Sequence, residues 1–317
     1  MYFIHFADSD IQYSIDKIVL KGALSARNDR SIWQPCFDFI DFFRRASLFK
    51  IKTYPCSVIF GQFAEFIVLE EAQPDGGSVV FRFGFNELDG VNWRRFQIVF
   101  NPNKLHLHFD VSRFLDYFRL RSKEFYCDET DIAIDFPADI KDFALVKDRR
   151  KKTTIDGGGS DLTYYLSTHR KNGFCKLYNK QLESKLDYPL TRFEMTLRAD
   201  GNRRLSVFDF DKLFPQLVVP GNLQQAFAEP LSASLQFIYD SCILYPDLRD
   251  KLSRLSAATA VKIRSRLRDF DGYFSPNLDI VSDLLAVMDI YLHRCFDREE
   301  FDLFVSFPRD FLHGAAR

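Results

Sequence analysis

Short stretches in which apolar and polar residues alternate recur through the first two thirds of the chain, and they restrict its fold more than any other feature. Alternation of this kind is typical of strands with one face on a core. We predict strands over residues 51–60, 65–70, 78–85, 95–100, 129–136, 162–167, 174–178 and 190–198. The turn signals Pro74-Asp75-Gly76-Gly77 and Leu88-Asp89-Gly90 separate strands of the first group, which favours antiparallel hairpins.

Helical spacing of apolar residues marks the rest of the chain. Segments 37–48 and 111–120 are expected to form helices over one face of the first strands. After residue 201 the pattern is helical, and we predict long helices over 231–244, 248–270 and 278–296. The predicted fold class is therefore α+β, with antiparallel sheets, covering helices and a helical C-terminal region.

The length of 317 residues favours more than one structural unit. We divide the chain into an N-terminal α+β domain at 1–125, a catalytic β block at 126–204 and a helical region at 205–317 with a predicted role in DNA binding. The two β regions are compatible with a similar α/β plan.

Composition narrows the class of protein. Hydrophobic residues make up 46% and charged residues 27%, which excludes a disordered or low-complexity chain. The 35 phenylalanines favour strands and large buried rings. The six cysteines show no zinc-ligand spacing, and no segment has the pattern of a signal peptide or a membrane span. We expect reduced thiols in a soluble, cytoplasmic protein with no membrane partner.

Positive charge is concentrated in one part of the chain. Residues 141–204 hold fifteen Lys/Arg against eight Asp/Glu, a local net charge of +7 in a chain whose net charge is -1. Cations interleaved with aromatic rings are typical of a single-stranded nucleic-acid site, although a charged segment can also be a solvated surface. The predicted DNA-binding residues here are Arg149, Arg150, Lys151, Lys152, Arg170, Lys176 and Arg192.

A second basic cluster falls within the predicted helical region. Lys262, Arg264, Arg266 and Arg268 recur every two residues, which gives two pairs spaced four apart. Such a helix can enter a major groove or lie along phosphates. The competing interpretation is a helix whose cations meet acidic neighbours in the folded protein.

Three acidic side chains and a tyrosine suggest phosphodiester chemistry. Asp131 and Asp135 share one face of the predicted strand at 129–136, and Glu194 lies on another strand. Carboxylates on neighbouring strands are suited to Mg²⁺ or Mn²⁺, which would act as a Lewis acid. Tyr178 is the candidate nucleophile. Lys180, two residues further on, is expected to share its face and either lower its pKa or stabilise the charge of the pentacovalent phosphate. A network of ion pairs between strands would explain the same pattern without chemistry.

Four motifs in this region occur in a familiar order. They are Thr130-Asp131-Ile132-Ala133-Ile134-Asp135, then Thr163-Tyr164-Tyr165-Leu166-Ser167, then Lys176-Leu177-Tyr178-Asn179-Lys180, then Thr191-Arg192-Phe193-Glu194. With these motifs the sequence, from about residue 95 to 200, resembles the replication initiation factors of rolling-circle plasmids and filamentous phages. The sequence departs from the family pattern in two places: Thr130 replaces its leading arginine, and Ser167-Thr168-His169 replaces the glycine that commonly follows the Tyr164-Tyr165 strand.

The resemblance implies an endonuclease and strand transferase that nicks and rejoins origin DNA. Tyr178 would attack the DNA, Asp131, Asp135 and Glu194 would hold the Mg²⁺ or Mn²⁺ ion, and Lys180 and Arg192 would bind phosphate. The implied partners are origin DNA, both duplex and extruded single strand, and a host helicase, because the chain has no GxxxxGK[ST] motif. A homodimer through the C-terminal helices is also expected.

Several alternatives remain open at this point. Tyr164 and Tyr165 are other candidate nucleophiles, and His106-Leu107-His108 is a rival metal site if it lies on a strand. The source replicon can be a plasmid or a phage. A non-catalytic DNA-binding regulator would need the basic residues without the acidic ones, and a phenylalanine-rich structural protein would need neither.

Overall fold

The computed structural model describes residues 4–55, 62–87, 90–147, 153–157, 163–167, 171–219, 254–268 and 273–312. Its strands are β1 (His5–Asp8), β2 (Ile11–Leu24), β3 (Phe49–Pro55), β4 (Phe63–Glu71), β5 (Ser78–Glu87), β6 (Gly90–Phe100), β7 (Ser122–Phe136), β8 (Ala144–Lys147), β9 (Thr153–Asp156), β10 (Thr163–Leu166), β11 (Cys175–Asn179), β12 (Thr191–Arg198) and β13 (Gln216–Val218). The main sheet has eleven strands, with ten in the order β3-β4-β5-β6-β2-β7-β12-β11-β10-β9 and β1 paired to β2. Every pairing is antiparallel.

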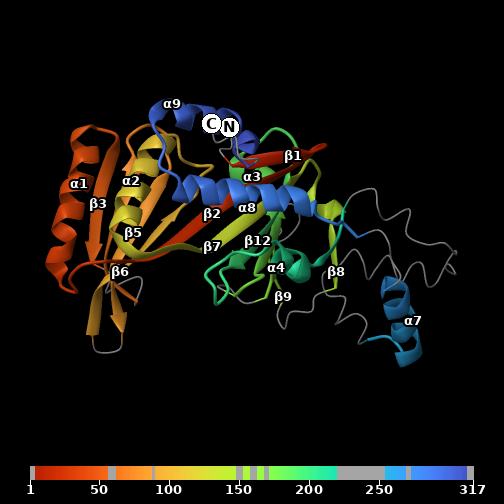
Figure 1. Ribbon diagram of the computed structural model, residues 1–317. Helices are drawn as coiled ribbons and strands as arrows, with labels where there is room; N and C mark the ends of the chain where they lie inside the picture. The colour runs from red at the N-terminus through yellow and green to blue at the C-terminus, as the bar shows by residue number, and fades with distance from the viewer. Residues whose placement is uncertain are drawn as a thin grey trace.

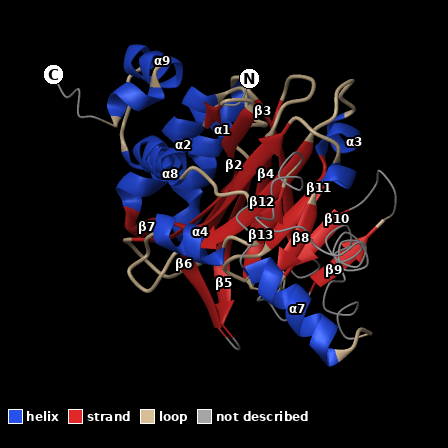
Figure 2. Ribbon diagram, turned by 90° about the vertical axis from the view of Figure 1, so that its right-hand side faces the viewer, coloured by secondary structure: helices blue, strands red, loops and turns tan. Residues whose placement is uncertain are grey.

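The helices are α1 (Gln34–Arg45), α2 (His108–Arg121), α3 (Lys180–Ser184), α4 (Val207–Leu213), α7 (Ala257–Arg268), α8 (Leu278–His293) and α9 (Arg298–Ser306), with short 3-10 turns at Arg30–Trp33, Ile140–Asp142 and Pro308–Phe311. Helices α1, α2 and α8 lie on one side of the sheet, and α8 crosses it near β2 (Figures 1 and 2). The predicted α+β class is confirmed, and α1, α2 and α8 match predicted helices. The predicted helix at 231–244 lies outside the described residues, as does part of the one at 248–270.

One sheet crosses the predicted boundary at residue 125. β7 begins at Ser122, and β2 pairs with both β6 and β7, so the two β regions are joined edge to edge. A small second sheet of β8 and β13 lies beside this main sheet. The division into 1–125, 126–204 and 205–317 stays a prediction about folding units.

The core on the helical side is built from large rings supplied at every second position. On β5, Val79, Phe81 and Phe83 are each no more than 1% exposed. Trp33, from the turn before α1, packs against Phe81 and Phe83 with ring centroids 5.4 and 4.9 Å apart. The alternation that predicts the strands therefore also separates a buried apolar face from a second, more polar face.

The central strand β2 is missing from the strand predictions. Its pairing with β7 shifts by one residue between Ile15 and Lys17, which leaves Asp16 as the extra residue of a β-bulge. Gly22 on the same strand allows close approach, because a Cβ atom there would lie 2.3 Å from the Phe96 ring. The bulge re-aims the β2 side chains and brings Asp16 and Lys17 to the polar face.

A buried carboxylate fixes the entry to α2. Glu71, 4% exposed, accepts hydrogen bonds from the backbone N–H groups of Gly77 (2.8 Å), His106 (2.8 Å) and Leu107 (2.6 Å). These groups belong to a turn and to the residues just before the helix, where backbone donors have no partner within the helix. Glu71 therefore ties the end of β4 to the start of α2.

The structure bears on the predictions about the cysteines and about membrane spans within the residues that it describes. Cys36, Cys127, Cys175 and Cys295 are free thiols, whereas Cys56 and Cys242 lie outside the described residues. Among the helices that the structure describes, none has the length and apolar character to span a bilayer.

Candidate active site

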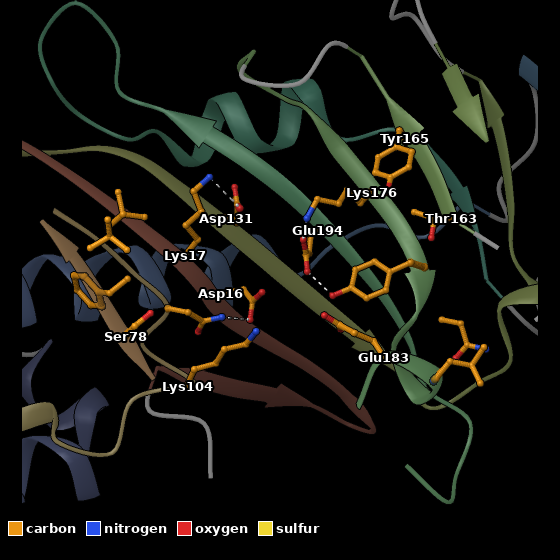
Figure 3. Close-up of a pocket in the computed structure, with 17 residues that line it drawn as sticks. Asp16, Lys17, Ser78, Lys104, Asp131, Thr163, Tyr165, Lys176, Glu183 and Glu194 are labelled. Atoms are coloured by element: carbon orange, nitrogen blue, oxygen red, sulfur yellow. Dashed lines mark hydrogen bonds and ion pairs between the residues drawn. The ribbon is translucent and has the colours of Figure 1, made fainter. Parts of the chain in front are cut away.

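A cavity of about 750 Å³ lies on the polar face of the sheet, opposite α1, α2 and α8. Its walls come from both predicted β regions, and Figure 3 shows the side chains that line it. Strands β2, β7, β12, β11 and β10 are adjacent in the sheet, so their polar side chains form neighbouring rows. Asp131, Lys176, Tyr178 and Glu194, all singled out from the sequence, line this cavity.

Tyr178 is held by a carboxylate at the cavity wall. Its hydroxyl donates a hydrogen bond to Oε1 of Glu194 at 2.6 Å, and Lys176 Nζ donates to Oε2 of the same carboxylate at 2.6 Å. Register explains the contact, because Lys176 and Glu194 are cross-strand partners and Tyr178 is the next residue on that face. Glu194 is only 4% exposed. The Tyr178 hydroxyl and the Lys176 ammonium group stabilise its buried negative charge.

The electrostatics keep Tyr178 protonated. Burial and then the negative charge of Glu194 raise the pKa of the Tyr178 phenol far above its usual value. Burial alone would lower the pKa of Lys176, but the charge and hydrogen bond of Glu194 outweigh it and raise that pKa. A Tyr178 nucleophile would therefore have to lose its proton during the attack, and Glu194 is the acceptor already in place.

Lys180 does not lie where the strand prediction puts it. β11 ends at Asn179, whose side chain accepts the N–H of Leu182 as the N-cap of α3, and Lys180 is the first residue of that helix. Its ammonium group pairs with Glu183 and lies 5.9 Å from the centre of the Tyr178 ring. The pKa of Tyr178 is raised overall, so a net lowering by Lys180 is not seen, and a role for Lys180 in stabilising charge on the phosphate stays a prediction.

Asp131 and Lys17 form the next part of the wall. Oδ1 of Asp131 accepts the Thr196 hydroxyl at 2.6 Å, and Oδ2 lies 3.4 Å from Lys17 Nζ. Lys17 also pairs with Glu129, and its side chain keeps 35% of its surface exposed. Asp131 therefore faces the cavity with one oxygen fixed and the other beside a cation that is open to solvent.

Asp135 and Arg192 are structural partners. They lie directly opposite each other on β7 and β12, and both carboxylate oxygens of Asp135 accept from the guanidinium at 2.6 Å. Arg192 is 1% and Asp135 3% exposed, and Asp16 accepts a further bond from Arg192 at 2.9 Å. Burial alone would raise the pKa of Asp16, but Arg192 and the Asn101 amide outweigh it and lower that pKa. Arg192 is thus buried between two carboxylates and is not exposed to solvent.

These contacts test the three predicted metal ligands. Asp135 is 3% exposed, is paired with Arg192 and is not among the side chains that line the cavity, so it does not fit. Asp131 and Glu194 do face the cavity, and two carboxylates completed by substrate phosphate oxygens are a donor set that Mg²⁺ accepts. Across the described ranges, no three His, Cys, Asp or Glu side chains form a group that could hold a metal ion. The donor chemistry therefore fits two of the three predicted ligands.

The structure separates the two alternative tyrosines. Tyr165 lines the cavity beside Lys176, its cross-strand partner, and stacks on Phe174 with ring centroids 6.2 Å apart. Tyr164 points to the opposite face, where it is 7% exposed and part of the core, and burial raises its pKa. Tyr178 and Tyr165 remain as candidates for attack in the cavity.

The histidine alternative rested on a strand that does not form. His106 lies in the loop before α2, and His108 is the first residue of the helix. Burial lowers the pKa of His108 to about 4. The expected pair of imidazoles on one strand face is therefore absent.

Apart from the buried Arg192, the predicted DNA-binding residues differ in how far the structure describes them. Lys176 reaches the cavity, and Lys262 is exposed on α7. Arg264, Arg266 and Arg268 lie on α7, but their side chains are not among those described. Arg149, Arg150, Lys151, Lys152 and Arg170 lie outside the described residues.

Four charged residues of the cavity were missed by the sequence predictions: Asp16, Lys17, Lys104 and Glu183. Asp16 and Lys17 sit at the β2 bulge, where regular alternation fails. Glu183 belongs to α3, and the signal for that helix is Asn179, a good N-cap residue three positions before Leu182. These residues make the cavity more highly charged than the predicted set alone.

Comparisons with known proteins give distant structural likeness alone. No protein-family model matches the chain, and no curated protein matches it in sequence. A solved structure of a rolling circle replication initiator protein from Geobacillus stearothermophilus is similar over 61% of this chain and 76% of that one, with 13% identity and a TM-score of 0.33. Because so distant a likeness carries no argument about chemistry, function has to be argued from the cavity.

Proposed function

We propose that this protein nicks and rejoins a single strand of DNA through a covalent tyrosine intermediate, as an initiator of rolling-circle replication. The observation that carries the proposal is the 2.6 Å hydrogen bond from the Tyr178 hydroxyl to Glu194, in a cavity that also holds Lys17, Lys104 and Lys176. A nucleophile, a proton acceptor and cations for a phosphate are the parts that such a transfer needs.

In the proposed reaction, Tyr178 is the nucleophile, Glu194 transfers the proton and Lys176 stabilises negative charge. The Tyr178 oxygen bonds to phosphorus while its proton passes to Glu194, and the bond from phosphorus to the 3′-oxygen breaks. The 5′-phosphate is then joined to Tyr178, and the proton held by Glu194 is the one that the departing 3′-oxygen needs. Rejoining reverses both transfers. Lys176 stays charged beside Glu194 and offsets the negative charge that builds up on the phosphate.

The proposal includes a divalent cation, Mg²⁺ or Mn²⁺, and Asp131 and Glu194 are the two of its three predicted ligands that line the cavity. When bound, such an ion would polarise a phosphate oxygen and offset the Glu194 charge that raises the pKa of Tyr178. Origin duplex, a host helicase and a second copy of the chain are proposed partners. Of the predicted DNA-binding residues on α7, Lys262 has a described side chain, and it is exposed; we propose that it contacts the duplex.

Covalent capture tests this function without knowledge of the origin. The protein is incubated with a random single-stranded 30-mer library in Mg²⁺ or Mn²⁺, and adducts that survive SDS are isolated and their attached tyrosine is mapped. Tyr178→Phe is expected to abolish the adduct, whereas Tyr188→Phe, at a half-exposed ring that does not line the cavity, is the matched control. Absence of any adduct rejects nicking, and an adduct on Tyr165 moves the nucleophile to the adjacent strand.

A non-catalytic DNA-binding protein is the second candidate, and one observation favours it. Glu194 and Asp131 already pair with lysines, and the phenol of Tyr178 is strongly held in its neutral form. If Glu194→Gln leaves DNA binding intact and the unaltered protein forms no adduct, this second function is the correct one.

A further inference from the structure

The cavity extends beyond the residues that the proposed reaction uses. At one end lie Tyr165 and Thr163, and at the other lies Ser78, from the first β region (Figure 3). Val80 on β5 and Val99 on β6 line that second end. The proposed transfer of the phosphate uses no residue at the end of the cavity lined by Val80 and Val99, so the role of this end has to be inferred separately.

The second end of the cavity has an apolar floor, whereas most of the remaining lining side chains are polar or charged. Val80 and Val99 are cross-strand partners, and both are half-buried. Their neighbours Val79 and Ile98 are 1% and 0% exposed in the core on the helical side, so the two valines point into the cavity. An apolar floor beside polar groups suits the flat face of a nucleobase rather than a phosphate.

The strand order gives the distance from this floor to the reacting groups. From Val99 on β6 to Glu194 on β12, the sheet passes through β2 and β7. Three strand spacings are about 14 Å. The register places Arg198, four residues from Glu194 on β12, in line with Val99, which adds about 13 Å along the strands. The separation is therefore about 19 Å, compared with a rise of about 3.4 Å for each stacked nucleotide. A base on the valines is therefore not the one next to the cleaved phosphate. Lys17 lies between the two, where it can meet a backbone phosphate.

We infer that Val80 and Val99 form a base-binding subsite for single-stranded DNA, roughly three to six nucleotides from the bond that is cleaved. The inference rests on the proposed function for the position of that bond, but it concerns binding alone. With this subsite, the first β region is part of the DNA-binding site, and the cavity holds the single-stranded DNA at a fixed distance from the cleaved bond.

A length series tests the subsite. Fluorescein-labelled oligothymidylates of two to ten nucleotides are titrated against the Tyr178→Phe protein, which cannot cleave them. Affinity is expected to rise in a distinct step once a strand is long enough to reach from Tyr165 to the valines. Val80→Asn should remove that step, with a loss of about fivefold to tenfold for the longer strands and no change for the shortest.

Two variants control for effects on folding. Val68→Asn places the same substitution on β4, directly opposite Val80 but outside the cavity lining, and Val80→Ile keeps the floor apolar. Both should retain the step, and circular dichroism checks that all variants keep the sheet. A step that survives in Val80→Asn, a step that Val68→Asn also removes, or no step in the parent protein overturns the subsite.

The two hypotheses can fail separately. A covalent adduct without a step that depends on Val80 leaves nicking in place and removes the subsite. A step that depends on Val80 without any adduct leaves the subsite and removes nicking.

Discussion

The pairing of Asp135 with Arg192 makes a sharp prediction, because the sequence suggests a metal ligand where the structure has a buried ion pair. In Asp135→Asn, Arg192 loses the carboxylate that accepts two of its hydrogen bonds at 2.6 Å. Removal of one partner from a buried pair typically costs about 3–5 kcal/mol. Asp16 still accepts from Arg192 at 2.9 Å, so we expect a loss near the lower value, about 3 kcal/mol.

Urea unfolding followed by circular dichroism measures this loss as a drop in the transition midpoint. Asp131→Asn is the matched control on the same strand and face, and its single 2.6 Å bond to Thr196 predicts a loss of about 1 kcal/mol. The expected pattern is a large loss of stability in Asp135→Asn, with covalent capture retained under conditions where the variant is folded. A loss below about 1 kcal/mol together with complete loss of capture would refute the structural assignment and return Asp135 to the reacting groups.

Three further predictions concern the scaffold. Gly22→Ala puts a Cβ atom 2.3 Å from the Phe96 ring, so thermal unfolding should show a loss of about 1–3 kcal/mol. In Glu71→Gln, the NH₂ group of the new amide replaces a carboxylate oxygen that accepts hydrogen bonds from backbone N–H groups. Urea unfolding should therefore show a free energy of unfolding lower by about 2 kcal/mol. Burial holds the pKa of His108 at about 4, below the ordinary 6.5, so the unfolded chain binds a proton in this window and the folded protein does not. The free energy of unfolding should therefore fall as the pH drops from 6.5 to 4, by at most about 3 kcal/mol, and His108→Gln should flatten that profile in acid titrations.

Local patterns predict the elements whose sequence is regular. Ile132 and Ile134 are buried on the core face of β7, and Asp131 and Asp135 share the other face as expected. On β2 three register shifts break the alternation, so its apolar residues follow no single period and the strand escapes detection. Asp16 is missed for the same reason.

Partner choice is harder to predict than position. That Arg192 meets Asp135, and Lys176 meets Glu194, depends on how strands far apart in the chain are aligned. The alternation places each side chain on a face but not beside a particular neighbour. The tyrosine and the acidic residues could therefore be selected from the sequence, whereas the buried ion pair and the lysine partners required the structure.

The position of β2 in the sheet has a consequence for synthesis on the ribosome. Residue 12 pairs with residue 135, so the N-terminal strand emerges long before its partner β7 is made. Until then β2 is paired in the sheet with β1 and β6, and its second edge is open to wrong pairing. A nascent chain that stops before residue 136 therefore exposes the strand that carries Asp16 and Lys17, and the cavity closes only after the ribosome has passed that point.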